Sequence, residues 1–196
     1  MRMSDIKAEK SKLRKKYLEM RNALSDSERS QADAVIFDRL TMLPEYIAAD
    51  TVFTYVSVGS EADTRRIINH ALGNNKSVAV PKCIDNRIIE FYYINSLDDL
   101  SPGAYGIPEP REGLKPAENL SGICLVPALL FDCDGYRIGY GKGYYDRFLP
   151  DFEGVTVGLC TSLFFVDILP RYGTDCPVDM IITDKEIYFA DDSNDY

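Results

Sequence analysis

The chain has 196 residues, of which 45% are hydrophobic and 27% are charged, as is typical of a globular protein with a buried core. The net charge of −9 disfavours nucleic-acid binding, and no run of about eighteen apolar residues is present to span a membrane. The charged N-terminus does not resemble a secretory signal. We therefore expect one cytoplasmic domain over residues 1–196, with no nucleic-acid partner, no membrane association and a monomeric state.

The cysteine and histidine content excludes several kinds of site. The cysteines are odd in number and form no C-x-x-C pair, which favours free thiols over a disulfide frame or a zinc site; they are Cys83, Cys124, Cys133, Cys160 and Cys176. His70 is the only histidine. A histidine-centred catalytic triad and a histidine-rich metal site are therefore not expected.

Positive charge is concentrated at the start of the chain. Residues 1–21 hold eight Lys/Arg and three Asp/Glu, a local net charge of +5 on an acidic protein. Residues 4–23 predict a helix with an apolar stripe, formed by Leu13, Tyr17, Met20 and Leu24. Lys10, Arg14 and Arg21 fall on a neighbouring stripe. A solvated basic face is the usual interpretation of such a stripe, whereas an anionic partner is the alternative.

The rest of the chain alternates between helices and strands. Ser25 and Glu28 form a capping box that starts a second helix, which Pro44 ends; its buried side is expected to hold Ala32, Val35, Ile36 and Leu40. A third helix is expected over 64–72. Short runs rich in β-branched and aromatic residues predict strands at 51–56, 77–80 (closed by Pro81), 88–93, 123–126, 155–160, 180–183 and 187–189.

This alternation predicts a three-layer α/β/α domain around a mostly parallel sheet. The two N-terminal helices, within residues 1–43, form a helical pair that should pack on the outside of the α/β body. Residues 57–61 follow the first strand, where α/β proteins commonly bind ligands. Residues 101–117 are rich in Pro and Gly and should form a rigid loop that walls a pocket. Residues 191–196 are expected to be a frayed acidic tail.

The stretch 137–147, Arg-Ile-Gly-Tyr-Gly-Lys-Gly-Tyr-Tyr-Asp-Arg, carries the most chemical information. Its alternating glycines allow backbone N–H groups to form a concavity for an anion. Lys142 adds a point charge, and Arg137 adds a planar fork suited to phosphate oxygens. A helix starts after Gly143, and Asp146 lies one turn inside it, where a carboxylate can meet a divalent metal that accompanies phosphates. This pattern predicts a nucleotide triphosphate site.

Two common phosphate loops are excluded by the spacing of these glycines. A P-loop requires a glycine where Tyr136 stands and a Ser or Thr where Gly143 stands. A G-x-G-x-x-G loop requires a third glycine at Tyr144 or at Asp146. The structural alternative is a glycine-rich turn before a short helix whose aromatic residues pack on the core. The cationic pair and the aspartate favour the functional interpretation.

Motifs along nearly the whole chain resemble the 5-formyltetrahydrofolate cyclo-ligase family, also called methenyltetrahydrofolate synthetases. The long glycine motif is highly specific, and the other motifs occur in the order typical of the family. The motifs are Lys10-x-x-Leu13-Arg14, Glu61-x-x-Thr64, the Gly-Ile-Pro-Glu-Pro run at 106–110, the glycine motif from Arg137 to Arg147, and Asp175-x-Pro-x-Asp179.

The resemblance implies a fold related to phosphosugar isomerases and CoA transferases. It also implies ATP- and Mg²⁺-dependent conversion of 5-formyltetrahydrofolate to 5,10-methenyltetrahydrofolate, with release of ADP and phosphate, through a phosphorylated formyl intermediate (an iminium phosphate). The implied small-molecule partners are ATP and the folate, and the implied cofactor is Mg²⁺. ATP would account for the basic N-terminal helix as its anionic partner.

The resemblance also assigns roles to residues of this chain. ATP would be bound by Lys10, Arg14, Arg137, Gly139, Gly141, Lys142, Gly143, Tyr144 and Tyr145. The folate would be bound by Val56, Glu61, Tyr140, Gly141, Lys142, Gly143 and Tyr144, with Glu61 accepting hydrogen bonds from the pterin. Asp146 and Asp175 would bind the metal. The catalytic residues would be Lys142, Arg137 and Tyr144, with Tyr144 at the formyl group.

Two alternatives stay open. The segment Ser57-Val58-Gly59-Ser60 is smaller than is usual in the family, so an ATP-dependent kinase or ligase with a different small-molecule acceptor is the first. The second is a non-catalytic protein that binds nucleotide or folate. Lys142, Asp146 and Asp175 argue against the second alternative.

Overall fold

The computed structural model describes residues 3–103 and 106–190. Their centre is a seven-stranded sheet in the order β12-β11-β9-β6-β1-β2-β3. The strands from β11 to β2 in this order run parallel, whereas β3 and β12 are antiparallel edge strands. The strand bounds are β1 Thr51–Thr54, β2 Ser77–Cys83, β3 Ile89–Ile94, β6 Ser121–Val126, β9 Glu153–Leu159, β11 Met180–Ile182 and β12 Ile187–Phe189. The predicted α/β class with a mostly parallel sheet is confirmed.

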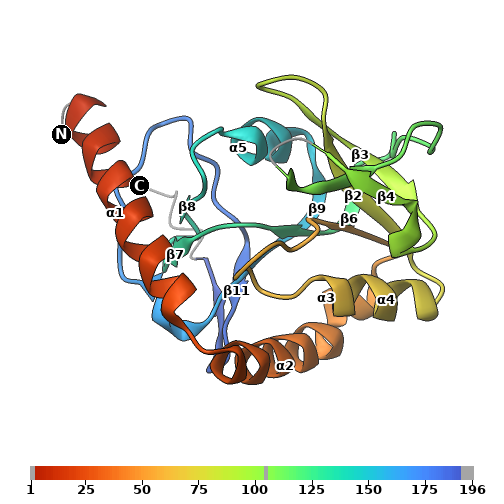
Figure 1. Cartoon of the computed structure of the whole chain (residues 1–196), viewed down its shortest axis with the longest axis horizontal. Helices are drawn as coiled ribbons and strands as arrows, with labels where there is room; N and C mark the ends of the chain where they lie inside the picture. The colour runs from red at the N-terminus through yellow and green to blue at the C-terminus, as the bar shows by residue number, and fades with distance from the viewer. Residues whose placement is uncertain (1–2, 104–105, 191–196) are drawn as a thin grey trace.

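One face of the sheet is covered by helices with apolar faces. α2 (Asp26–Met42), α3 (Pro44–Ala48) and α4 (Arg65–Gly73) lie along this face (Figure 1). Their buried side chains meet residues of β1, β2, β6, β9 and β11 in one hydrophobic cluster. The largest fully buried side chains of these helices are Ile36, Leu40, Tyr46, Ile67 and Ile68. Burial of this apolar surface is the main stabilising contribution on this side of the molecule.

The opposite face is covered by short elements. α5 (Tyr144–Phe148) packs there with a small sheet of β10 (Phe165–Val166), β7 (Leu130–Asp132) and β8 (Arg137–Ile138). Aromatic rings connect α5 to the main sheet, since the ring centroids of Phe91 and Phe148 lie 4.6 Å apart and those of Phe53 and Phe152 lie 5.1 Å apart. Among the described residues, 3₁₀ turns on this side include Leu149–Asp151 and Ser162–Phe164, whereas the turn Leu97–Asp99 packs on the helix-covered side.

The first helix, α1 (Met3–Ala23), packs on the α/β body apart from α2. It runs beside β8, away from α2, so the two N-terminal helices contact different hydrophobic clusters and do not pack as a pair on one face (Figure 1). Leu13, Tyr17 and Leu24 are partly buried, but Met20 of the predicted apolar stripe is 39% exposed. The fully buried residues of α1 are two cations, whose partners lie in the site described below, and the interpretation as a solvated basic face is wrong for them.

Several boundaries also differ from the prediction. β2 continues through Pro81 to Cys83, because beyond Ala79 it is no longer paired with β1 and a residue without an N–H group is tolerated there. Val35 is 37% exposed on α2, although the Ser25–Glu28 capping box and the other buried positions of that helix are confirmed. The described part of the Pro- and Gly-rich loop includes a two-stranded sheet of β4 (Leu100–Pro102) and β5 (Pro108–Pro110).

The cysteines and the histidine have the environments that the sequence predicts, within the described residues. All five cysteines are free thiols. His70 has a structural environment, since its Nδ1 lies 2.9 Å from the hydroxyl of Tyr46. No helix in the described ranges has the length and apolar character required to cross a membrane. The expected frayed tail at 191–196 lies outside the described residues.

Candidate active site

The glycine stretch forms a loop between β8 and α5, as predicted. Gly141 has a φ of +92° and Gly143 a φ of +65°, backbone conformations that favour glycine over residues with a Cβ atom. Gly143 is the N-cap of α5, but this helix has only five residues, so its dipole is a small contribution. Any anion bound here would depend mainly on loop N–H groups and on the surrounding cations.

Arg137 anchors the start of this loop. Its guanidinium is nearly buried, forms an ion pair of 2.8 Å with Asp146 and donates a hydrogen bond to the carbonyl oxygen of Cys176. The Cys176 N–H in turn donates to the Asp146 carboxylate at 3.3 Å. These contacts bring together the loop, the first turn of α5 and the segment around residue 175. That segment is distant in sequence from the loop and from α5.

Two cations of α1 dock against the same region. Lys10 is 5% exposed and forms an ion pair with Asp175, while its ammonium lies 4.7 Å from the centre of the Tyr172 ring. Arg14 donates from Nε to the carbonyl oxygen of Gly139 at 2.8 Å. A Cβ atom at Gly141 would lie only 3.2 Å from the Arg14 guanidinium carbon, so the loop glycine also makes room for this contact. The predicted grouping of Lys10 and Arg14 with the glycine loop matches this geometry.

The carboxylates of Asp146 and Asp175 are suited to a divalent cation. They are held on neighbouring segments by the Cys176 and Tyr172 N–H groups. Each is also paired with a protein cation, Arg137 or Lys10 respectively. Among the described residues no cluster of three or more His, Cys, Asp or Glu side chains is placed to hold a metal. A Mg²⁺ ion would therefore need phosphate oxygens and water as additional ligands, which is its usual mode of binding.

A second polar cluster lies beside the loop and centres on Glu61. The Val58 N–H donates to Glu61 Oε2 at 2.9 Å, and the Tyr140 hydroxyl donates to Oε1 at 2.8 Å. Burial, followed by the nearby Glu61 charge, raises the pKa of Tyr140 to about 12. The hydroxyl therefore keeps its proton at neutral pH and remains a donor to Glu61. Arg21 donates to the oxygen of the same hydroxyl.

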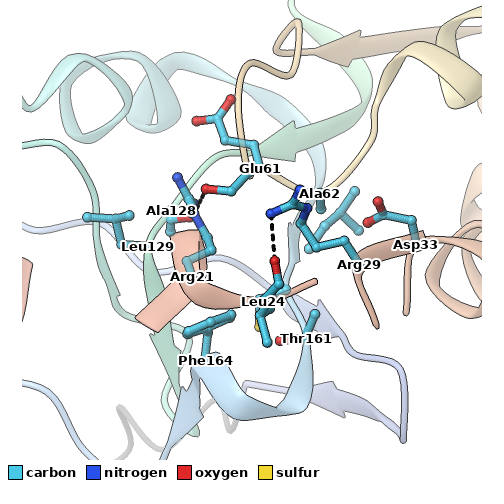
Figure 2. Close-up of a pocket in the computed structure, with 13 residues that line it drawn as sticks. Arg21, Leu24, Arg29, Asp33, Glu61, Ala62, Ala128, Leu129, Thr161 and Phe164 are labelled. Carbon is cyan, nitrogen blue, oxygen red and sulfur yellow. Dashed lines mark hydrogen bonds between the residues drawn. The ribbon is translucent and has the colours of Figure 1, made fainter. Parts of the chain in front are cut away.

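Glu61 also lines two adjoining pockets. The first lies between the end of α1, the start of α2 and the residues after β9 (Figure 2). In it, Arg21 extends toward Ala128 on one side, and Arg29 and Asp33 of α2 lie on the other (Figure 2). The second is a more open cleft of about 390 Å³. Its lining residues are Arg29, Asp33, Ser57, Val58, Gly59, Glu61, Asp63, Arg65, Gly106 and Pro108.

The tip of the β2–β3 hairpin closes the other side of the glycine loop. Tyr144 donates its hydroxyl hydrogen bond to the Asp85 carbonyl oxygen at 3.0 Å. Arg147 donates to the carbonyl oxygens of Arg87 and Lys142. The hydroxyl of Tyr145 is buried and has no hydrogen-bond partner among the residues that the structure describes, and burial raises its pKa well above the usual range. Tyr145 is therefore a packing residue in this structure.

The structure brings most of the predicted site residues into one region. Val56 differs from the others, since it is 2% exposed and packs in the core cluster beneath the site. Lys142 is exposed. Sequence reasoning did not assign Arg21, Arg29 or Asp33 to the site. Arg21 had a signal, because it lies on the same helical stripe as Lys10 and Arg14, whereas Arg29 and Asp33 resembled ordinary polar residues of an amphipathic helix.

These features define an α/β protein with a cationic glycine loop beside a pair of carboxylates. The sequence matches the model of the 5-formyltetrahydrofolate cyclo-ligase family over residues 6–184. The chain therefore belongs to this family of ligases.

Individual relatives agree with this assignment. The structure is similar to that of the 5,10-methenyltetrahydrofolate synthetase of Aquifex aeolicus, with a TM-score of 0.83, 36% identity and coverage of 95% of both chains. The sequence is 26% identical to the probable 5-formyltetrahydrofolate cyclo-ligase of Caenorhabditis elegans, over 96% of this chain and 99% of the relative. It is 30% identical to the probable cyclo-ligase of Schizosaccharomyces pombe over a shorter match, which spans 60% of each chain.

Proposed function

We propose that this protein uses ATP and Mg²⁺ to convert 5-formyltetrahydrofolate to 5,10-methenyltetrahydrofolate, with release of ADP and phosphate. The observation that carries the proposal is the convergence of α1, the glycine loop and the segment around Asp175. In this arrangement Lys10, Arg14 and Arg137 lie around one loop of suitable shape for phosphates. Family membership supports the identity of the folate substrate.

The first step requires activation of a poor leaving group. The formyl oxygen attacks the γ-phosphorus of ATP, a P–O bond to that oxygen forms, and the bond to ADP breaks. The product is an iminium phosphate. Catalysis of phosphoryl transfer depends mainly on positioning and on neutralising charge. Lys142 and Arg137 would supply positive charge, and the N–H groups of the loop at Gly139, Gly141 and Gly143 would orient the phosphates.

The second step closes a ring within the same folate. N10 attacks the formyl carbon, the C–O bond to phosphate breaks, and the N10 proton is released with phosphate, leaving the methenyl cation. Because this attack is intramolecular, correct orientation of the folate supplies much of the rate, with an upper range of about 7–11 kcal/mol for well-oriented reactions. Glu61 and Tyr140 would hold the pterin end, and Tyr144 would lie near the formyl group after its contact with Asp85 is released. No protein nucleophile is required.

Asp146 and Asp175 would hold Mg²⁺, which would neutralise negative charge on the phosphate oxygens of ATP. In the structure these carboxylates are paired with Arg137 and Lys10. When MgATP binds, Lys10 would therefore exchange its contact with Asp175 for a contact with a phosphate. The basic face of α1 would then account for recognition of the nucleotide.

The test is an ultraviolet assay for the methenyl chromophore with 5-formyltetrahydrofolate, MgATP and purified protein. We expect product only when both ATP and Mg²⁺ are present. Absence of product from folded protein would contradict the folate assignment. A panel of other acceptors, scored by ADP release, would then test the alternative of a different acceptor. Such an acceptor would bind beside the small residues Ser57, Val58 and Gly59, which line the open cleft.

A further inference from the structure

Arg21 has an unusual environment that the proposed reaction does not yet explain. It is 6% exposed, and within the described ranges no carboxylate lies at ion-pair distance from it. A buried charge without a direct counter-ion is costly, so its retention requires good hydrogen bonds or a charged group close by. Arg21 makes three such hydrogen bonds, and they connect three other segments of the chain to α1.

The guanidinium of Arg21 donates hydrogen bonds to one buried backbone carbonyl group and to side chains of two loops. Nη1 donates to the carbonyl oxygen of Ala128 at 3.1 Å, in the buried connection between β6 and β7 (Figure 2). Nε donates to Ser60 Oγ at 3.1 Å, next to Glu61 in the loop after β1. Nη2 donates to the Tyr140 hydroxyl in the glycine loop. Arg21 therefore joins the Glu61 loop and the glycine loop through one rigid, planar group.

The direction of the hydrogen bonds through Tyr140 is fixed by its two neighbours. A guanidinium has only donors, so the Tyr140 oxygen must accept from Arg21. An ionised carboxylate only accepts, so the Tyr140 proton must point to Glu61. With Val58 N–H bonded to the other oxygen, the Glu61 carboxylate is held in one orientation, and each oxygen keeps a lone pair for another donor.

Tyr140 needs such support because its own surroundings do not fix it. It lies between Gly139 and Gly141, and the residue as a whole is 52% exposed, although its hydroxyl is shielded from water by Arg21 and Glu61. A half-exposed ring between glycines has few packing contacts to hold one conformation. The two hydrogen bonds of its hydroxyl are therefore the main restraint on its position.

We infer that Arg21 is a positioning residue for the folate substrate: through Tyr140 and Ser60 it holds Glu61 in the orientation that accepts N–H groups of the pterin. This inference rests on the proposed function. Arg21 lies on the same stripe of α1 as Lys10 and Arg14, but it serves the folate side of the site, whereas those two face the glycine loop and Asp175. One helix thus contributes to both substrate subsites.

The test is a double-mutant cycle of Arg21→Gln and Tyr140→Phe, with kcat and both KM values measured in the methenyl assay. Each single variant should raise the KM for 5-formyltetrahydrofolate about tenfold, as expected for loss of one hydrogen bond to a charged group, and leave the KM for ATP within about twofold. The double variant should be no worse than the more damaging single variant, because both remove the same connection.

Three further variants complete the test. Arg21→Lys keeps the charge but cannot bridge three segments, so its folate KM should stay raised, and a wild-type value would contradict the bridging role. When Glu61→Gln is already present, adding Arg21→Gln should change the KM for the folate very little. Lys15→Gln, which removes an exposed cation of the same helix, should match wild type. Circular dichroism and thermal melts would confirm that each variant is folded.

The outcomes separate this inference from the proposed function. Additive effects in the cycle, or an equal rise in the KM for ATP, would show that Arg21 only attaches α1 to the body of the protein. Either result would overturn this inference, whereas turnover by the wild-type protein would still support the proposed function. An inactive wild-type protein would overturn both. If Arg21→Gln does not fold, Tyr140→Phe together with Glu61→Gln forms an alternative cycle, and additivity there would equally contradict the chain of contacts.

Discussion

The two faces of the central sheet are covered in different ways. On one face, α2, α3 and α4 bury Ile, Leu and Tyr side chains in a continuous apolar cluster. On the other, α1 and the glycine loop are joined largely by cations, whose partners are carboxylates, carbonyl oxygens and hydroxyls. Apolar burial is non-directional and stabilises the fold, whereas hydrogen-bonded charges have defined geometry and can exchange partners.

This contrast explains why α1 is well suited to a substrate site. Its apolar residues are only partly buried, and its deepest contacts involve Lys10 and Arg21. Contacts of this kind can be replaced by contacts to an anionic ligand without opening the hydrophobic core. The comparison predicts that changes in the apolar helices of the first face alter stability more than chemistry, and that changes of the charged residues around the glycine loop on the second face do the reverse.

The largest effect on stability is expected for Leu40→Ala on the apolar face. Leu40 is fully buried, so removal of its side chain should lower the free energy of unfolding by about 2–5 kcal/mol. Urea unfolding would measure this change, and kcat/KM per folded molecule should be unaffected. Ile47→Ala is the matched control, because Ile47 is 62% exposed in the neighbouring helix. Equal destabilisation by the two changes would contradict the packing described here.

Lys142→Ala should show the opposite behaviour. Lys142 is exposed, so the free energy of unfolding should change little. Removal of one electrostatic donor should cost about 2–4 kcal/mol of transition-state stabilisation, measured as a fall in kcat/KM of the methenyl assay. Lys185→Ala removes an exposed lysine beyond β11 and serves as the control. Near-normal turnover of Lys142→Ala would exclude the role proposed for this residue.

Asp146→Asn should weaken the response to magnesium. The asparagine loses the negative charge that favours Mg²⁺, so the concentration for half-maximal activity should rise several-fold. Calorimetry of Mg²⁺ binding in the presence of a non-hydrolysable ATP analogue would compare the magnesium affinity of the variant and the wild type without turnover. Asp134→Asn is a close control, because Asp134 also pairs with an arginine, Arg171, at 2.9 Å. An unchanged magnesium titration would remove Asp146 from the proposed metal site.

Glu61→Gln is expected to have the most selective effect, on one substrate rather than on both. It keeps an acceptor oxygen but loses the charge and one acceptor, so the KM for the folate should rise by about fivefold to tenfold, more than the KM for ATP. Glu118→Gln, at an exposed position, should leave both values unchanged. Equal effects on the two KM values would place Glu61 outside the pterin pocket.

The sequence predicted much of the fold because the signals were local. The capping box at Ser25 and Glu28, the β-branched runs and the glycine loop each depend on neighbouring residues, and each is found in the structure. The continuation of β2 through Pro81 was missed because it depends on which strand pairs with it at that point. Helix periodicity likewise showed that α1 has two stripes but could not show which of them is buried.

The site was predicted less completely for the same reason. Lys10, Arg14 and the loop residues were found through motifs, and the roles proposed for them remain predictions. Arg21 is placed by contacts with residues 39, 107 and 119 positions away. No local pattern encodes such contacts. Tyr144 could be assigned to the loop, but its hydrogen bond to Asp85 depends on a hairpin that is distant in sequence.

The most direct test of the account is the ratio of ADP to methenyl product formed by wild-type protein with 5-formyltetrahydrofolate and MgATP. The proposed reaction consumes one ATP for each ring closed, so the account predicts equal molar amounts throughout the time course, and no ADP when the folate is omitted. Release of ADP without methenyl product, or methenyl product without ADP, would contradict the coupling of the glycine loop to folate chemistry.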